Sequence, residues 1–204
     1  MKQPLAAYGS RPGAVSREGP LWGRAARPVA QGTIDALWHN EPSSLNMSHK
    51  WSSLTFEPSD EAVQQLRESW SWLLREPFVP VLFSVLGDVF FEPRSGGVWW
   101  LNAGTADVSR VAGSVEEFQG LLGTDLVEEW FMPSLVARLH AAGKRPSAGE
   151  CFTYVTLPVF REGTYEVSNM NPVNAREHFA LTGHILQEIR ELPDGAQVRI
   201  NVGS

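Results

Sequence analysis

The chain has 204 residues, of which 43% are hydrophobic and 20% are charged, and its formal net charge is -6 at pH 7. This length suits one folded domain of about 150 residues with an appendage, and such a domain folds without a disulfide or a metal. The negative charge argues against a general nucleic-acid-binding protein, because such proteins need a basic surface to displace counterions from phosphates. It suits a protein whose partner is itself basic.

Cys151 is the single cysteine, so an internal disulfide is impossible and the reducing cytoplasm is the expected compartment. The longest apolar stretch, residues 78–91, is interrupted by Pro80, Gly87 and Asp88 and falls short of the ~20 residues of a membrane helix. The first ten residues lack the apolar middle of a signal peptide. A soluble protein is therefore expected, with no membrane contact and no direct contact to nucleic acid.

Residues 1–46 differ from the rest of the chain. They hold five glycines and five prolines and carry a net charge of +2, whereas the remainder carries -8. Such a segment is not expected to offset its ordering entropy by burying apolar surface, so we expect it to be disordered and expect the folded domain in residues 47–204. One hypothesis is that Met47 is the native start. The alternative is a short docking arm built on Leu21, Trp22, Leu37 and Trp38.

The first regular element is predicted to be a helix that begins after Ser59. Ser59 suits an N-cap, and Asp60 and Glu61 then fall in the first turn, where the helix dipole favours acids. The apolar positions repeat at helical spacing. They are Val63, Leu66, Trp70 and Leu73.

Three short runs rich in β-branched and aromatic residues follow, at 81–91, 96–102 and 106–112. They predict strands joined by hairpin turns at 92–97 and 102–105. Trp99 and Trp100 are consecutive, and consecutive side chains of a strand point to opposite faces. Either helices cover both faces of this sheet, or one of the two tryptophans is exposed.

Two helical segments are predicted next. Ser114 and Glu117 form a capping box before a helix with Val115, Phe118 and Leu122 on its inner side. Thr124 can cap a second helix, which Pro133 should kink or divide and Gly143 should end. Its apolar side consists of Val127, Trp130, Phe131, Val136 and Leu139.

The remaining segments predict two strands at 151–159 and 163–170, a helix at about 173–192 and a closing strand at 194–200. Helices and antiparallel hairpins in this order indicate a single compact α+β domain with about four helices. On the last helix, His178 falls within an apolar stripe, which predicts a hydrogen-bonded core histidine, and His184 lies on the polar side. The stripe consists of Leu181, Ile185, Ile189 and Leu192.

No nucleophile, phosphate-binding or zinc motif occurs in the chain, so no catalytic residue, metal or cofactor is expected. Cys151 suits a small buried hydrophobe. An alternative is a small hydrolase or ligand-binding enzyme whose site is assembled from distant residues such as His178, Asp88 and Cys151. A third interpretation is a scaffold or regulatory module.

Other features favour recognition of a protein. Eight tryptophans are present, and aromatic side chains are favoured anchors at interfaces. Glu116, Glu117, Glu128 and Glu129 can steer a basic partner by long-range attraction, although a solvated helix face is the favoured explanation of these acids. Together with Trp99 and Trp100, these glutamates are the predicted partner-binding residues.

Residues 149–198, with weaker support from residues 80–143, resemble the C-terminal domain family of type VI secretion immunity proteins of the Tdi type. The positions that carry the resemblance are Gly149, Pro158, Gly163, Tyr165, Asn169, His178, Gly183, Gln187, Leu192, Pro193 and Gly195.

The resemblance implies a bacterial cytoplasmic immunity protein that binds a cognate toxic effector, a DNase in the type case, and protects the producing cell and its kin. It brings no catalytic residues. On this interpretation the protein inhibits by stoichiometric occlusion of a basic nuclease.

Overall fold

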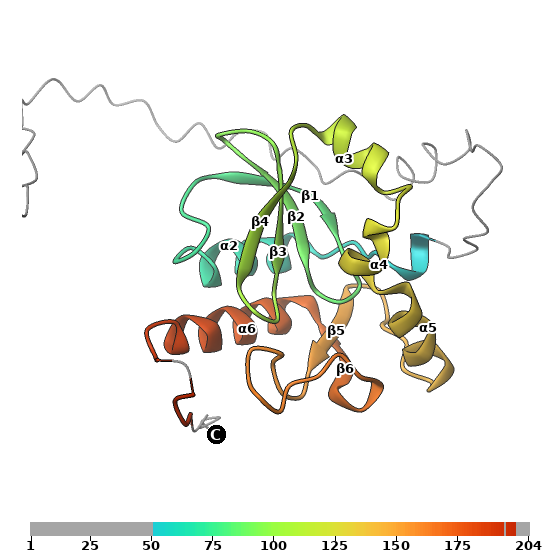
Figure 1. The fold of residues 1–204 in the computed structure, drawn as a ribbon, viewed down its shortest axis with the longest axis vertical. Coiled ribbons are helices and arrows are strands. Elements are labelled where there is room, and N and C mark those ends of the chain that lie inside the picture. The colour runs from blue at the N-terminus through green and yellow to red at the C-terminus, as the bar shows by residue number, and fades with distance from the viewer. Residues whose placement is uncertain (1–50, 194, 199–204) are drawn as a thin grey trace, which may run out of the picture.

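The computed structural model describes residues 51–193 and 195–198, and this part of the chain has the predicted α+β architecture (Figure 1). The predictions for residues 1–46, Met47 and the docking arm lie outside the described residues. The elements are η2 (Trp51–Ser53), α2 (Asp60–Ser69), β1 (Phe78–Phe83), β2 (Val89–Pro93), β3 (Val98–Asn102), β4 (Asp107–Ala112), α3 (Val115–Leu121), α4 (Leu126–Phe131), α5 (Pro133–Ala141), β5 (Glu150–Tyr154), η3 (Val167–Asn169), β6 (Met170–Asn174) and α6 (Ala175–Ile189).

Local capping signals placed the starts of α2 and α3 correctly, whereas α4 begins after Asp125, which makes no side-chain cap hydrogen bond, and not after the predicted cap Thr124. Ser59 accepts a hydrogen bond from Ala62 N at the start of α2, and Ser114 accepts one from Glu117 N at the start of α3. Pro133 divides the predicted long helix into α4 and α5, because Met132 between them takes the left-handed conformation with φ 43°. The described residues therefore contain five α-helices rather than about four.

The strands form two antiparallel sheets, one in the order β1-β2-β3-β4 and one of β5 and β6. The predicted single strand at 81–91 is wrong, because residues 84–88 form a turn between β1 and β2. Ser84 N donates to Asp88 O at 3.0 Å, and Gly87 has φ +88°. Every residue from 81 to 90 is buried, so the turn lacks the polar composition by which turns are usually recognised.

The predicted strand at 163–170 is also wrong. The partner of β5 is β6, in a register that pairs Glu150 with Asn174 and Tyr154 with Met170, and residues 155–166 form a loop. Asn169 closes this loop: its Oδ1 accepts from Thr156 N, and its Nδ2 donates to the carbonyls of Thr156 and Thr164, at 2.8–2.9 Å. The closing strand at 194–200 is not formed in its described part, residues 195–198.

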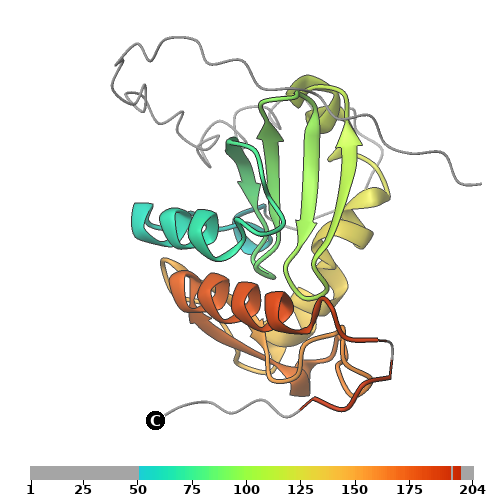
Figure 2. The same ribbon diagram turned by 90° about the vertical axis from the view of Figure 1, so that its left-hand side faces the viewer.

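Helices cover both faces of the four-stranded sheet (Figure 2), so the first alternative for the two tryptophans holds. Trp100 stacks on Phe90 with ring centroids 6.2 Å apart, on the face covered by α3 and α4. Trp99 pairs with Phe91 on the other face, on the side of α2 and α6. Both tryptophans are half-buried.

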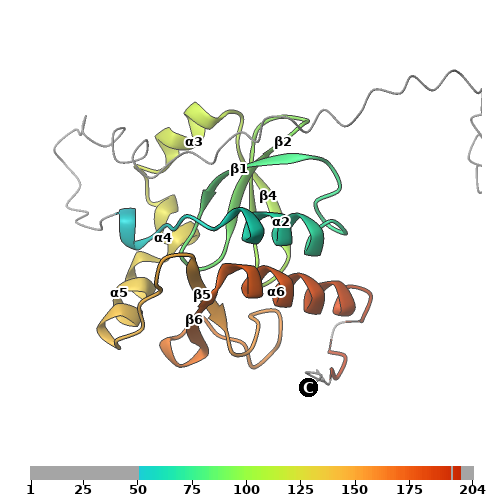
Figure 3. The same ribbon diagram turned by 180° about the vertical axis from the view of Figure 1, so that it is seen from behind.

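Helices α2 and α6 lie side by side beneath the sheet (Figure 3). The apolar stripe predicted for α6 is wrong in part, because Leu181 and Leu192 are 46% exposed. The buried side instead includes Phe179, Thr182 and Gly183. A Cβ at Gly183 would lie only 2.8 Å from the Ser69 side chain, so this glycine allows the two helix backbones to approach closely and sets which side of α6 faces inward.

The buried turn at residues 84–88 joins the two sheets. Val85 N donates to Leu54 O at 2.8 Å, and Val85 O accepts from Phe152 N of β5 at 2.7 Å. Gly87 lies directly against the imidazole of His178 on α6, and a Cβ at this position would overlap the ring. This turn therefore fixes β5 and α6 relative to the four-stranded sheet.

Replacing Gly87 with alanine is expected to destabilise the fold much more than replacing Gly96. The two glycines have almost the same φ, +88° and +87°, but a Cβ at Gly96 has nothing within 4 Å. The backbone cost in the left-handed region is about 1–2 kcal/mol for either alanine, and overlap with His178 adds to it only at Gly87. We expect the free energy of unfolding in urea to fall by about 1 kcal/mol for Gly96→Ala and by about 3 kcal/mol or more for Gly87→Ala. Equal losses would contradict the close contact.

Candidate functional site

Asp88 lies in a buried polar cluster, directly before the first residue of β2. Its Oδ1 accepts a hydrogen bond from Ala103 N at 2.9 Å, and no ion pair to it is found among the described residues. Burial raises the pKa of Asp88 to about 7, against opposing contributions from the Ala103 N–H and the Trp100 side chain. The Trp100 Nε1 is close enough to act on this pKa, although it does not reach hydrogen-bonding geometry with any partner.

His178 and Cys151 lie on the other side of the same turn. The imidazole Nδ1 of His178 is 3.0 Å from Thr153 Oγ1, and burial lowers the pKa of His178 to about 4, against an opposing contribution from the Gly87 backbone. Cys151 is fully buried, and burial followed by the charge of Asp88 raises the pKa of its thiol far above the usual range. His178 is thus a core histidine and Cys151 a buried hydrophobe, as predicted.

The enzyme alternative relied on these three side chains. The fold brings them into one region but buries each of them to 97% or more. A thiol that stays protonated is a poor nucleophile, and a histidine with a pKa of about 4 is far from the value that suits a general base near neutral pH. Within residues 51–193 and 195–198, no group of three potential metal ligands is present either.

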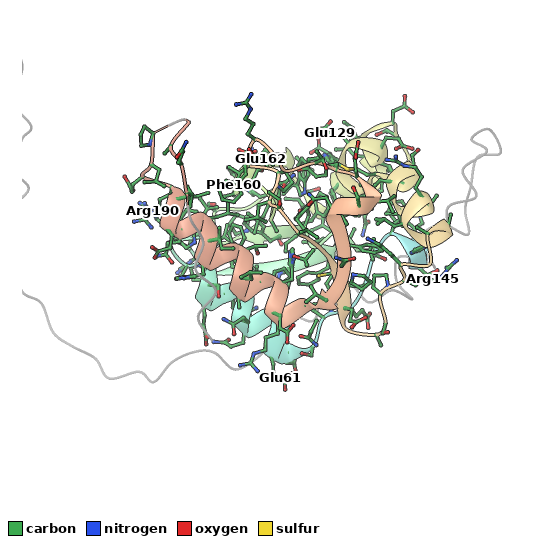
Figure 4. All side chains as sticks on the ribbon, turned by 90° about the horizontal axis from the view of Figure 1, so that it is seen from below. Glu61, Glu129, Arg145, Phe160, Glu162 and Arg190 are labelled. Atoms are coloured by element: carbon green, nitrogen blue, oxygen red, sulfur yellow. The ribbon has the colours of Figure 1, made fainter. Side chains whose placement is uncertain are left out.

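The four predicted glutamates are all exposed. Glu116 and Glu117 lie on the first turn of α3, and Glu128 and Glu129 lie on α4, whose outer side carries Glu129 in Figure 4. The pKa of Glu116 is lowered, first by a hydrogen bond from its own backbone N–H and then by one from the Ser114 hydroxyl.

Some of these carboxylates have local partners. Glu117 Oε2 accepts from Gly113 N at 2.6 Å, and Glu128 Oε1 accepts from Ser134 Oγ at 3.1 Å. Asp125, which was not predicted, is exposed between α3 and α4. Residues 113–132 therefore carry five acids and no basic residue, and we call them the acidic segment. Figure 4 shows the basic residues Arg145 and Arg190 near opposite ends of the molecule.

The acidic segment lies over the aromatic layer on one face of the sheet. Phe90 of β2 contacts Phe118 of α3 at 4.8 Å, and Trp130 and Phe131 of α4 at 5.6 and 5.3 Å between ring centroids. These rings hold α3 and α4 on the sheet and direct the carboxylates outward. Trp100 borders this layer, whereas Trp99 lies on the opposite face, so the predicted partner-binding residues do not all share one surface.

Comparison with known proteins matches one part of the chain to a family. Residues 113–186 match the model of T6SS immunity protein Tdi1, C-terminal. This confirms the resemblance seen in the sequence, over a shorter range. The match to the Tdi1 C-terminal family includes all four glutamates and the elements from α3 to most of α6, but not Trp99, Trp100 or the four-stranded sheet. No curated protein matches the chain.

Four of the positions that carry the Tdi1 resemblance have clear structural roles in this fold. Asn169 closes the loop at 155–166, and His178 packs on Gly87. Gly183 allows α6 to approach α2, and a Cβ at Gly163 would overlap the Leu157 carbonyl. They maintain the scaffold that carries the acidic segment.

None of the helices in the described part of the chain is long and apolar enough to cross a membrane.

The stability of the protein is expected to depend on pH through Asp88 and His178 with opposite signs. Between about pH 4 and 7 the folded state keeps a proton on Asp88 that the unfolded state loses, so this group lowers the free energy of unfolding as the pH rises. Between about pH 4 and 6.5 the unfolded state binds a proton on His178 that the folded state lacks, so this group raises the free energy of unfolding as the pH rises. The two contributions nearly cancel in the natural protein.

Removing one of them should reveal the other. Relative to the natural protein, Asp88→Asn should gain stability with rising pH by about 1.4 kcal/mol per pH unit between about pH 4 and 6.5, and His178→Gln should lose it with a similar slope. Urea unfolding at a series of pH values measures both differences. Variants whose stability runs parallel to that of the natural protein would show that neither group titrates in this window.

Cys151 is expected to resist thiol reagents until the protein unfolds. Because it is the single cysteine and is fully buried, labelling by a maleimide at about pH 8 should be very slow in the native protein and complete in urea. Ser109→Cys, on the exposed side of β4, supplies the control: this added thiol should react at once. Rapid labelling of native Cys151 would reopen the enzyme alternative.

Proposed function

We propose that this protein is a T6SS immunity protein that binds a cognate effector and neutralises it. The observation that carries the proposal is the match of residues 113–186 to the Tdi1 C-terminal family. The burial of Asp88, Cys151 and His178 agrees with a protein that acts by binding rather than by catalysis. On this proposal the protein acts in the bacterial cytoplasm, where the effector would otherwise reach its target.

The proposed mechanism is stoichiometric occlusion of a basic effector, a DNase by analogy with the type case of the family. A nuclease needs a basic groove to bind phosphates, and an acidic protein surface can occupy that groove in place of DNA. The acidic segment supplies such a surface, since it carries five acids without a basic residue. Charge of this kind accelerates encounter, and close packing at the interface then determines how long the complex lasts.

The proposed contact residues are Glu116, Glu117, Glu128 and Glu129, with the exposed parts of Trp100 and Trp99 as apolar contacts. Glu129 suits direct pairing with lysine or arginine, because no hydrogen bond of its side chain to another described residue is found. Glu116 is exposed in the same acidic segment, and the Ser114 hydroxyl favours its charged form. Trp100 lies on the same face of the sheet as α3 and α4. Trp99 lies on the opposite face, so it can take part only if the effector reaches round the edge of the sheet.

The first test is capture of the partner by the full chain at low salt from cells that express the secretion genes, with mass spectrometry of the retained proteins. We expect one basic protein in a one-to-one complex, whose nuclease activity is abolished by an equimolar amount of this chain. A partner that is bound but whose activity persists would contradict neutralisation. If the inhibited effector belongs to another enzymatic class, the proposed immunity function stands and only the assignment of the effector as a nuclease is wrong.

Charge reversal on the acidic segment should slow association with the effector. The variant Glu116→Lys/Glu129→Lys is expected to lower the association rate constant on the order of tenfold at low salt, with a smaller effect at high salt because the charges are screened. The matched control is Glu162→Lys/Glu188→Lys, which changes the same number of exposed charges elsewhere. Surface plasmon resonance measures both rates. Equal slowing in the two variants would assign the effect to net charge rather than to the acidic segment.

A further inference from the structure

Within the described part of the chain, Asp88 is the only buried acidic side chain. The sheet register shows what surrounds it. Val89 pairs with Leu101 and Phe90 pairs with Trp100, and side chains alternate between the faces along each strand. Asp88 therefore lies on the face of Phe90 and Trp100, at the level of Asn102. This is the face covered by α3 and α4.

One hydrogen-bond donor near this carboxyl has no acceptor in hydrogen-bonding geometry. The Trp100 Nε1–H is buried and unpartnered, and the Trp100 side chain interacts with Asp88. Buried donors are normally paired, because an unpaired one keeps its full desolvation penalty. A protonated carboxyl has one oxygen engaged by Ala103 N and carries a hydrogen on the other. The ionised form can accept at both oxygens and is the stronger acceptor, so loss of the proton makes Asp88 a better partner for the Trp100 indole.

The titratable groups that face Asp88 come from three other parts of the fold. Cys151 and Tyr154 belong to β5, and Tyr165, whose hydroxyl accepts from Asn102 Nδ2 at 3.3 Å, belongs to the loop before β6. His178 of α6 packs against the adjacent Gly87, and its pKa of about 4 leaves it uncharged at neutral pH. Among residues 51–193 and 195–198, no cation forms an ion pair with the carboxylate. Burial favours the neutral acid and the donors favour the ion, and this opposition places the pKa of Asp88 at about 7.

We propose that Asp88 is a proton-operated switch: when it loses its proton, the carboxylate accepts a hydrogen bond from the Trp100 indole and draws that ring along the sheet. Trp100 stacks on Phe90, and Phe90 contacts Phe118, Trp130 and Phe131. A shift of Trp100 is therefore transmitted to α3 and α4, which carry the acidic segment. The switch depends only on groups of this chain and does not require the proposed function.

The experiment follows the indole N–H of Trp100 by nitrogen–proton NMR of the full chain, with the resonance assigned by its loss in Trp100→Phe. The pH is varied from about 5.5 to 8.5, more than one unit on each side of the Asp88 pKa of about 7. We expect the indole proton to move downfield as the pH rises, with a midpoint near 7, because a carboxylate is a strong acceptor. The movement should vanish in Asp88→Asn and persist in Asp107→Asn, the control that removes an exposed carboxylate from β4.

A second measurement needs no variant and covers the case in which Asp88→Asn fails to fold. Carbon NMR of the full chain labelled at the aspartate carboxyls should show one carboxyl that titrates near pH 7, well above the ordinary value of about 3.9. The proposal is overturned if every aspartate carboxyl titrates below about pH 5. It is equally overturned if the Trp100 resonance does not move with pH, or if its movement survives in Asp88→Asn.

Discussion

The contact between Gly87 and His178 is the constraint on which the rest of the fold depends. Gly87 turns the chain between β1 and β2 in a conformation that suits glycine, and the space left by its missing side chain receives the imidazole from α6. The same turn binds Leu54 and Phe152 through the backbone of Val85. One buried turn therefore sets the position of α6, the small sheet and the first residues of the described chain relative to the large sheet.

This constraint explains the unusual ionisation in the core. Packing α6 on the turn buries His178 and places Asp88 next to aromatic rings, with no ion-pair partner among the described residues. His178 therefore stays uncharged at neutral pH, and Asp88 keeps its proton up to about pH 7. The acids that remain charged are confined to the surface, and those of α3 and α4 face outward because the aromatic rings beneath them hold the two helices flat on the sheet.

Local signals made part of this structure predictable from the sequence. Ser59, Ser114 and Pro133 act through their own neighbours in the chain, so the starts of α2 and α3 and the helix break after the acidic segment were predicted correctly. The turn at 84–88 was missed because it is apolar and is stabilised by distant residues. Strand β6 was misplaced because it contains Pro172, which argues against a strand, and because Asn169 supplies the hydrogen bonds of the preceding loop. The cluster around Asp88 forms only when the two sheets pack together, so no residue spacing in the sequence predicts it.

The segment that matches the immunity family shares its core with the residues that precede it. Its rings pack on Phe90, its small sheet bonds to Val85, and its last helix rests on Ser69 and Gly87, all of which precede residue 113. Recombination between relatives at residue 113 would thus separate the acidic segment from the sheet and turn on which it packs. On the proposed function, a change of partner is therefore expected to arise by point changes on the outer helix faces, or by inheritance of the sheet and the helices as one unit.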